Sequence, residues 1–247
     1  MYNLMCGDCL ELMDKIPDHS VDLILADLPF GTTHCPWDSV IDLDKLWEHY
    51  KRIIKPYHAI VLFSQQPFTT KLISSNYDWF KYCWIWEKNR SPNFMMAKYV
   101  PLKTTEEIIV FSEGGINTNC KHPVPYYPQG LEDVSIHVKS NVKKQGVNIR
   151  NCLNKEYIQT KSGYPKNILK FNCESGFHPT QKPVTLCEYL IKTYTQEGET
   201  VLDNCMGSGT TGVACSNTNR NFIGIEKDSK FFGTAIERIE GCPLKTE

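Results

Sequence analysis

The feature that most constrains the fold is a series of short apolar runs spread along the chain. They fall at residues 21–26, 59–63, 82–86, 107–111, 200–203 and 221–226. Several place Val, Ile and Leu at consecutive positions, which is typical of strands buried on both faces of a parallel sheet. Helical patterns separate most of the runs, at 43–54, 183–195, from 210 onward and at 231–239. This alternation predicts an α/β fold with an open, mostly parallel sheet and helices on both faces.

Residues 113–177 break the alternation. The segment is polar, rich in Asn, Lys, Pro and Tyr, and its apolar residues show no clear period. We interpret it as an insertion of loops and small elements that adds no layer to the core. The chain is therefore divided into a first part, 1–112, the insertion, 113–177, and a second part of the same domain, 178–247.

Charge is distributed unevenly along a chain that is almost neutral overall. Residues 81–182 hold 15 basic and 8 acidic side chains, whereas the remaining residues hold 12 basic and 20 acidic ones. Such a basic middle would give the molecule a face that attracts phosphates. A chance fluctuation along a neutral chain is the alternative.

Composition also narrows the class of protein. No apolar run approaches the roughly 18 residues of a membrane span, and residues 1–4 show no basic segment followed by an apolar stretch, so we expect a cytoplasmic protein without a membrane partner. The 11 cysteines then indicate reduced thiols. Cys6 and Cys9 form a C-x-x-C pair that could serve redox chemistry or zinc. Because no second ligand pair accompanies them, a structural role is favoured and no metal is expected.

A first candidate site follows the apolar run 21–26. Asp27, Leu28, Pro29 and Phe30 stand where open sheets carry their chemistry, outside the carboxyl end of a strand. The Asp27 carboxylate and the Leu28 carbonyl can accept the two hydrogens of an amino group, and Phe30 can stack on a flat heterocycle. A strand-ending turn with Phe30 packed in the core explains the tetrapeptide equally well.

A second candidate site lies near the C-terminus. The run 200–203 leads into a Gly207-Ser208-Gly209 turn followed by a helix, where glycines allow a ligand close to the backbone. Glu226 ends the next strand and could accept the hydroxyls of a ribose. The third glycine of the dinucleotide fingerprint is missing, which disfavours NAD. A tight turn with a solvated glutamate is the alternative.

A third motif completes the set. Residues 176–183 read Gly-Phe-His-Pro-Thr-Gln-Lys-Pro and lead into a helix, either as a ligand-contacting loop or as a helix start. Along the chain, Asp27–Phe30 comes first, the segment 113–177 follows, then the motif that ends at Pro183, and last the Gly207-Ser208-Gly209 turn. In this chain order the motifs resemble the beta group of amino-methyltransferases, a circularly permuted arrangement common among phage and prophage DNA methylases. The resemblance covers essentially the whole chain and includes Gly7-Asp8, Trp37-Asp38 and residues 86–90.

The resemblance implies a Rossmann-like fold that uses S-adenosylmethionine, and methyl transfer to adenine N6 in DNA with base flipping. Asp27 and Leu28 would hold the target amino group, Pro29 would fix the turn, and Phe30 would stack on the flipped base. Glu226 would bind the ribose of the cofactor. The other cofactor-binding residues that it implies are Asp8, Asp203, Gly207, Ser208, Gly209, Thr210, Thr180, Gln181 and Lys182, with Asp8 on the adenine amino group and Lys182 a partner for the methionine carboxylate.

Double-stranded DNA is the partner that the resemblance implies. Parts 1–112 and 178–247 would carry catalysis and cofactor binding, and 113–177 would recognise the target sequence. The residues expected to bind DNA are Lys88, Asn89, Arg90, Lys143, Lys144 and Arg150. A homodimer and an accompanying restriction enzyme stay open at this point.

The catalytic tetrapeptide departs from the common Asp-Pro-Pro-Tyr of that group. Leu28 keeps the backbone carbonyl and Phe30 keeps the stacking face, so we expect activity to survive. An aspartate in first position favours adenine N6, since serine is more usual where cytosine N4 is the target. The alternatives are cytosine N4 methylation, a catalytically weak module that binds S-adenosylmethionine or DNA, and an RNA or protein substrate. Cytosine C5 chemistry is rejected because Cys35-Pro36 reverses the Pro-Cys pair of such enzymes.

Overall fold

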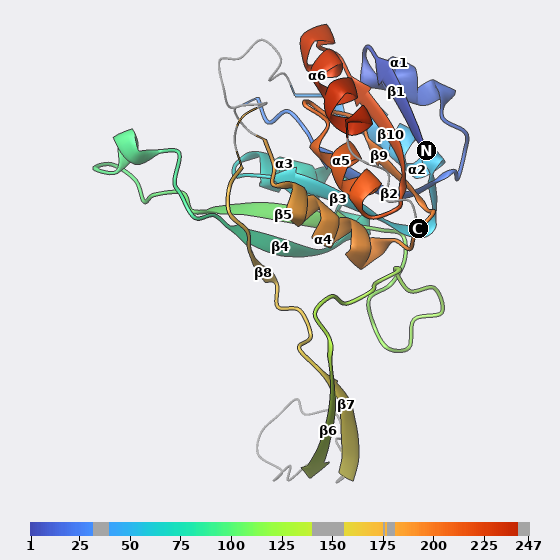
Figure 1. The fold of residues 1–247 in the computed structure, drawn as a ribbon, viewed down its shortest axis with the longest axis vertical. Coiled ribbons are helices and arrows are strands. Elements are labelled where there is room, and N and C mark those ends of the chain that lie inside the picture. The colour runs from blue at the N-terminus through green and yellow to red at the C-terminus, as the bar shows by residue number, and fades with distance from the viewer. Residues whose placement is uncertain (32–39, 140–155, 175, 177–180, 242–247) are drawn as a thin grey trace. The chain divides into compact units, whose positions relative to one another are not determined.

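The computed structural model describes residues 1–31, 40–139, 156–174, 176 and 181–241. The chain divides into a larger unit, Met1–Tyr127 with Asn167–Glu247, and a smaller unit, Pro128–Lys166. Figure 1 shows the elements of each. No helix in the described part of the chain combines the length and apolar character that a membrane span requires.

The larger unit is built on an eight-stranded sheet with the order β1-β10-β9-β2-β3-β5-β4-β8. Neighbouring strands are parallel except at β5, which is antiparallel to both β3 and β4. The strands are β1 (Tyr2–Cys6), β2 (Val21–Asp27), β3 (Ile54–Ser64), β4 (Phe80–Glu87), β5 (Thr105–Phe111), β8 (Ile168–Lys170), β9 (Thr200–Asp203) and β10 (Asn221–Glu226). The helices are α1 (Cys9–Leu12), α2 (Leu43–Ile53), α3 (Phe68–Ser75), α4 (Val184–Tyr194), α5 (Thr210–Asn217) and α6 (Ser229–Glu240).

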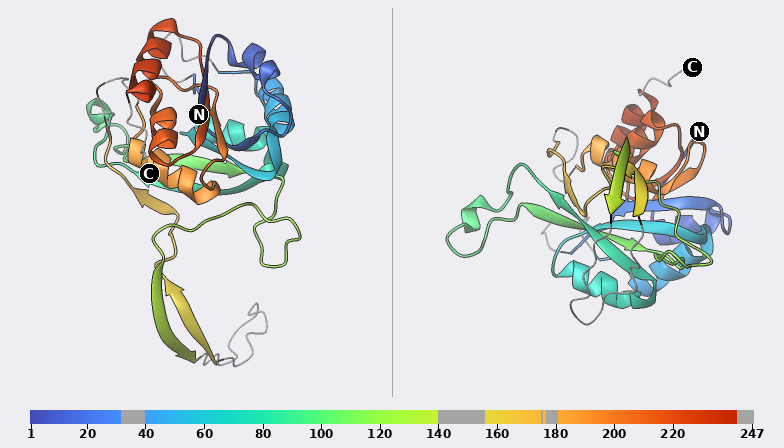
Figure 2. Two further views of the ribbon diagram at one scale, coloured as in Figure 1. Left: turned by 45° about the vertical axis from the view of Figure 1, so that its right-hand side comes forward. Right: turned by 90° about the horizontal axis from the view of Figure 1, so that it is seen from below.

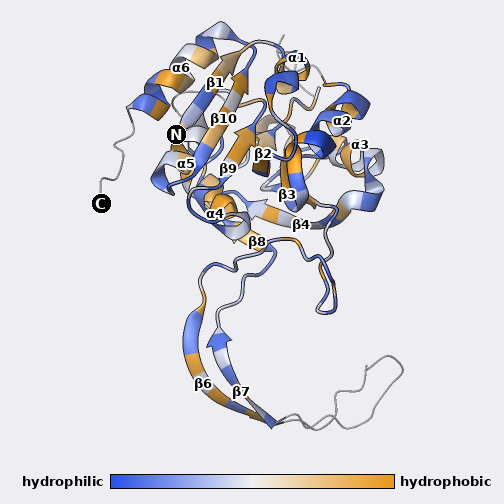
Figure 3. Cartoon of the chain, turned by 90° about the vertical axis from the view of Figure 1, so that its right-hand side faces the viewer, coloured by the Kyte–Doolittle hydropathy of each residue, from blue (hydrophilic) through white to orange (hydrophobic). Residues whose placement is uncertain are grey.

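Helices cover both faces of this sheet, as Figures 1 and 2 show. Because successive side chains of a strand point to opposite faces, β2 contributes side chains to two hydrophobic cores, one on each face of the sheet. Leu23 and Leu25 pack in the core that includes residues of α4, α5 and α6. Ile24 and Ala26 pack in the core beneath α1, α2 and α3. Figure 3 shows that the strands at the centre of the sheet are hydrophobic. Burial on both faces explains the consecutive apolar residues of run 21–26.

Local signals set the ends of the two most amphipathic helices. The Asp42 side chain accepts backbone N–H groups at the start of α2, and the Asp228 side chain does the same for α6. Such N-caps satisfy donors that have no partner within the helix. Both helices also end with basic residues in the last turn, which complement the helix dipole.

The predicted α/β fold is confirmed, and each of the predicted strands and helices is present. Four strands and α-helices of the larger unit were not predicted: β1, α1, α3 and β8. The segment 113–177, interpreted as loops and small elements that add no layer to the core, contributes β8 to the edge of the existing sheet. This short strand pairs with β4 and buries Leu169, which is only 6% exposed. A three-residue strand is too short to show a period, so the pattern alone does not reveal it.

The smaller unit holds an antiparallel pair, β6 (Glu132–Lys139) and β7 (Glu156–Ser162). Its apolar side chains are largely exposed: Ile136 is 48%, Tyr157 54% and Ile158 58% exposed. An isolated two-stranded ribbon is marginally stable in water, and these exposed side chains add little buried apolar area to it. Lys143, Lys144 and Arg150 lie outside the described residues.

Candidate active site

The topology gathers the predicted site residues at one edge of the larger sheet. The carboxyl ends of β1, β10, β9 and β2 lie there because these strands are parallel neighbours. Cys6 pairs with Glu226 in register, and the Gly7 N–H donates to the Glu226 carbonyl at 2.9 Å. The antiparallel β5 begins at this same edge, so Glu106 joins the group. Residues from five strands therefore converge.

A buried ion-pair network stands at the centre of this edge. Lys182 Nζ lies 2.7 Å from Asp27 Oδ2 and 2.8 Å from Glu106 Oε1. On its other oxygen, Glu106 accepts from Lys88 Nζ at 2.6 Å. The side chains of Lys182 and Glu106 are only 10% and 6% exposed. The Lys182 ammonium also faces the rings of Phe30 and Phe63, at 5.9 and 5.1 Å from their centroids.

Burial and charge set the protonation of this network. Burial raises the pKa of Asp27 above its ordinary value; the Lys182 ammonium opposes this shift and the Glu106 carboxylate adds to it. Burial alone would raise the pKa of Glu106, but Lys182 and Lys88 together lower it. For Lys182, burial alone would lower the pKa, but the Asp27 and Glu106 carboxylates outweigh it and the pKa is raised. Lys182 therefore stays charged beside Asp27.

Asp27 carries an acceptor that the rest of the site does not use. Its Oδ1 atom is buried and accepts no hydrogen bond from the described residues, although the side chain as a whole is 27% exposed. Leu28 is buried, whereas Pro29 and Phe30 are partly exposed. Phe30 stacks on Phe68 with ring centroids 5.4 Å apart. A buried acceptor without a partner is costly, so a ligand donor is the expected partner of Oδ1.

The glycine turn after β9 offers an open backbone. Gly207 has φ +52°, and a Cβ placed on it would meet nothing within 4 Å. Glu226 is fixed beside the turn, because Oε2 accepts the Gly207 N–H and Oε1 accepts the Asp228 N–H, both at 2.8 Å. Asp8 caps α1 and lies 3.0 Å from Lys227 Nζ. Cys6 is exposed and Cys9 buried on either side of this cap.

Hydrogen bonds and burial fix the remaining residues around the glycine turn. Asp203 accepts the Thr211 hydroxyl at 2.6 Å and the Cys205 N–H at 3.0 Å, and burial raises the pKa of Asp203 to about 7. Ser208 and Thr210 are buried, and Arg238 donates to the Ser208 carbonyl at 2.6 Å. These contacts give three of the predicted cofactor residues a structural role in shaping the turn.

Gly209 has a packing role of its own. Its φ is +80°, and a Cβ would lie 2.9 Å from the Ala235 side chain of α6. We expect Gly209→Ala to lower the free energy of unfolding by about 1–3 kcal/mol, through backbone strain and overpacking. Gly207→Ala is the matched control, with strain but no clash, and we expect it to weaken cofactor binding more than stability. Chemical unfolding and titration calorimetry measure both quantities, and a larger stability loss for Gly207→Ala would contradict the assignment.

The residues predicted to bind DNA differ in their surroundings. Lys88 is 13% exposed and bound to Glu106, whereas Asn89 and Arg90 are exposed. Asn89 accepts the Cys173 N–H at 2.9 Å. Gln181, predicted to contact the cofactor, donates to Glu174 at 3.3 Å. Thr180 and Trp37-Asp38 lie outside the described residues, and the roles assigned to all these residues stay predictions.

Sequence reasoning missed Glu106. It lies immediately before the apolar run 107–111, next to Glu107, and none of the recognised motifs includes it. A signal was nevertheless present, since a charged residue among buried β-strand positions is rarely tolerated unless it is paired. The network also gives Lys182 partners other than the expected cofactor carboxylate.

Comparison with known proteins identifies the class. Residues 21–237 match the model of the DNA methylase family N6_N4_Mtase, and the chain belongs to this family. It is a DNA methyltransferase that uses S-adenosylmethionine. Two relatives from the curated proteins share about a quarter of their aligned residues with it.

Two type II methyltransferases illustrate that distance. M.HpaI of Haemophilus parainfluenzae is 24% identical over 96% of this chain and 74% of its own length. M.HinfI of Haemophilus influenzae is 26% identical over 97% of this chain and 68% of its own length.

Solved structures share the fold across the whole chain. The M1.HpyAVI complex with S-adenosylmethionine has a TM-score of 0.61 at 24% identity and covers 97% of this chain and 99% of its own. The cytosine-N4-specific PvuII DNA methyltransferase has a TM-score of 0.67 at 17% identity, covering 96% and 86%. The predicted methyltransferase fold, with its mostly parallel sheet, is thereby confirmed.

Proposed function

We propose that this protein methylates adenine N6 in double-stranded DNA and is a circularly permuted member of the beta group. The observation that carries the proposal is the buried Oδ1 of Asp27, which accepts no hydrogen bond from the described residues while Oδ2 is held by Lys182. An oxygen fixed in this way suits an N–H of an exocyclic amino group. Asp rather than Ser at position 27 favours adenine over cytosine.

The residues at the edge of the sheet fit S-adenosylmethionine. The open backbone at Gly207 provides room for a ligand against the turn, and Glu226 presents a fixed carboxylate to ribose hydroxyls. Asp8 would accept from the adenine amino group. Gly209, Ser208, Thr210 and Asp203 would shape the turn. Thr180, Gln181 and Lys182 would lie toward the methionine part.

For methyl transfer, the protein has to place the amino group of the base and stabilise the positive charge that develops on its nitrogen. When bound, S-adenosylmethionine supplies a methyl group on a positively charged sulfur. Asp27 Oδ1 and the Leu28 carbonyl hold the two amino hydrogens, and Phe30 stacks on the flipped base. Transfer of the methyl group to the amino nitrogen would break the C–S bond of the donor, and the electron pair of that bond would stay on sulfur. One amino proton is released along the hydrogen bond to Asp27, whose carboxylate stabilises the positive charge that develops on nitrogen.

Target recognition is assigned to residues 113–177, with 1–112 and 178–247 forming the catalytic and cofactor-binding parts. The antiparallel ribbon β6–β7 within this segment supports the assignment, because a two-stranded ribbon fits the major groove of DNA. The proposed DNA-binding residues are Asn89, Arg90, Lys143, Lys144 and Arg150. Lys88, which was also predicted to bind DNA, is held by Glu106.

Expression in a host without DNA methylation tests the proposal directly. We expect genomic DNA to acquire N6-methyladenine within one short sequence, detected by nucleoside mass spectrometry and modified-base sequencing. N4-methylcytosine instead would support the second candidate function, cytosine N4 methylation, which is the specificity of the similar PvuII enzyme. Asp27→Ala in the same host is the control. Unmodified DNA from a host that holds folded protein, able to bind S-adenosylmethionine, would point to a binding module.

A further inference from the structure

The connection between β4 and β5, residues 88–104, carries an unusual surface. We call it the β4–β5 arm. Its large apolar side chains are exposed to an extent that soluble proteins seldom show in one place. Phe94 is 75%, Met95 93% and Tyr99 80% exposed, and Met96 is 49% exposed. Figures 1 and 2 show that the arm extends away from the sheet.

Hydrogen bonds give the arm a defined shape. Its base is closed by Lys88 N–H donating to the Thr104 carbonyl at 2.7 Å. Within it, Asn93 Oδ1 accepts the Lys103 N–H at 2.8 Å, and Asn93 Nδ2 donates to the Pro101 carbonyl at 3.2 Å. A single 3₁₀ turn, η3 (Phe94–Met96), forms the apolar tip. The exposed side chains therefore stand on a braced projection.

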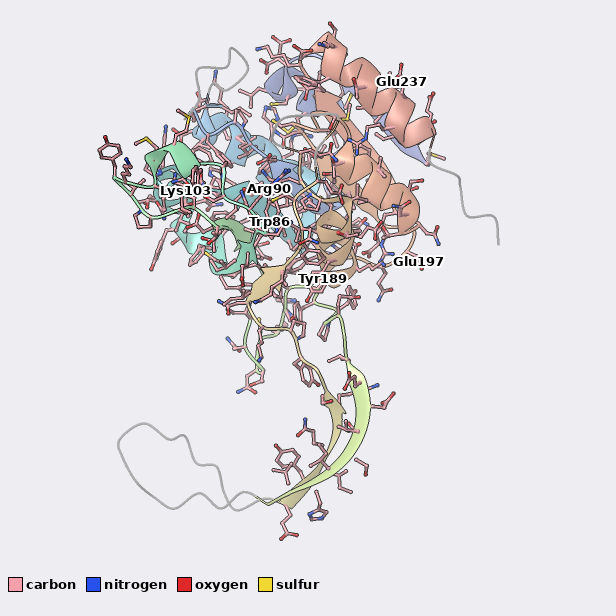
Figure 4. The ribbon with its side chains drawn as sticks, turned by 60° about the vertical axis from the view of Figure 1, so that its left-hand side comes forward. Trp86, Arg90, Lys103, Tyr189, Glu197 and Glu237 are labelled. Carbon is pink, nitrogen blue, oxygen red and sulfur yellow. The ribbon has the colours of Figure 1, made fainter. Side chains whose placement is uncertain are left out.

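The positive charge of the arm indicates a negatively charged partner. Residues 88–104 contain four basic side chains and no acidic one. Lys88 is bound to Glu106, but within the described ranges no carboxylate pairs with Lys98 or Lys103. Figure 4 places Arg90 and Lys103 on this connection. A surface that is both apolar and basic would repel a second copy of itself, whereas it complements stacked bases flanked by phosphates.

The position of the arm links it to catalysis. It leaves the sheet at the carboxyl end of β4 and returns at the start of β5, the edge where Asp27 lies. Its first residue, Lys88, is bound through Glu106 to Lys182 and hence to Asp27. An apolar side chain that enters the base stack beside the target would stabilise the gap left by a flipped base, as apolar wedges do in kinked duplexes.

We propose that the β4–β5 arm is a DNA wedge: Phe94 and Met95 enter the base stack next to the target nucleotide, and Lys98 and Lys103 contact the adjacent phosphates. This inference rests on the proposed function. It adds a surface outside the segment 113–177 that holds the duplex open and does not read its sequence.

Base flipping provides the first test. The probe is a duplex carrying the methylated sequence with 2-aminopurine at the target position, whose fluorescence rises when the base leaves the stack. We expect Phe94→Ala combined with Met95→Ala to reduce the flipped fraction about tenfold or more, because unstacking then lacks its compensation. Affinity for S-adenosylmethionine should not change. Tyr77→Ala is the matched control, since Tyr77 is 72% exposed just before β4, at the opposite end of that strand.

Salt dependence provides the second test. We expect Lys98→Gln combined with Lys103→Gln to lower the slope of log affinity against log salt by about 2, one per lost phosphate contact. Unchanged flipping in the Phe94/Met95 variant, with normal duplex binding and methylation by the unaltered protein, would overturn the wedge alone. An unaltered protein that neither binds nor methylates duplex DNA would overturn the proposed function as well. If the unaltered protein is a dimer and the Phe94/Met95 variant is a monomer that still flips the base, the tip serves self-association and the wedge is overturned.

Discussion

Replacing Asp27 with alanine should reduce DNA methylation by about 10²- to 10³-fold or more, while affinity for S-adenosylmethionine stays within about twofold. The expected loss is large because Asp27 supplies both the acceptor and the charge that stabilise the reacting nitrogen. Cofactor binding should survive, since the glycine turn follows β9 and Glu226 ends β10, whereas Asp27 ends β2. Single-turnover methylation and titration calorimetry measure the two quantities. An equal loss of cofactor affinity would contradict the assigned role.

Asp27→Asn separates the acceptor from the charge. An asparagine keeps one carbonyl oxygen and replaces the other with an NH₂ group. The Lys182 ammonium, at 2.7 Å from Oδ2, will draw the carbonyl oxygen toward itself. The NH₂ group then faces the substrate amino group, donor against donor. We therefore expect Asn to be as inactive as Ala. Substantial activity in Asp27→Asn would show that a neutral acceptor is sufficient.

The sequence pattern was sufficient to predict the architecture because burial on both faces leaves a strong local signal. Runs such as 21–26 and 59–63 are apolar at consecutive positions, which is typical of strands in a sheet that is covered on both faces. The antiparallel direction of β5 leaves no such signal, since a strand buried on both faces reads alike in either direction. Strand direction depends on how the connections cross the sheet, which a local pattern does not contain.

The site was predictable where a motif follows directly after a strand. Asp27, Gly207 and Glu226 each lie at or just beyond the carboxyl end of a buried run, so the sheet itself brings them together. Glu106 and Lys88 were different. Their place in the site arises from pairing between β4 and β5, in which Trp86 lies opposite Glu106, and this is a contact between segments far from Asp27 in sequence. Only the three-dimensional structure reveals that Lys182 lies between two carboxylates.

Replacing Lys182 with methionine should shift the pH dependence of methylation to higher pH. Lys182 opposes the rise in the pKa of Asp27 that burial causes. Without the ammonium, the Asp27 pKa rises further, so the low-pH limb of the pH–rate profile moves to higher pH and the rate on that limb falls. Raising the pH should restore part of the rate. The variant should also lose about 3–5 kcal/mol of stability, because two buried carboxylates are left without their shared cation.

Glu106→Gln is the matched variant, and the sign of its effect is opposite. The Glu106 charge raises the pKa of Asp27, so its removal should shift the low-pH limb of the profile downward while Lys182 still holds Asp27. Both variants disturb the same packed network, and a purely structural role would lower the rate without moving the limb in opposite directions. Full pH–rate profiles, with thermal unfolding and cofactor affinity measured alongside, separate these cases. If the limbs stay in place, Lys182 and Glu106 do not position Asp27. A selective loss of cofactor affinity in Lys182→Met would instead support the carboxylate-binding role of Lys182 that the family resemblance implies.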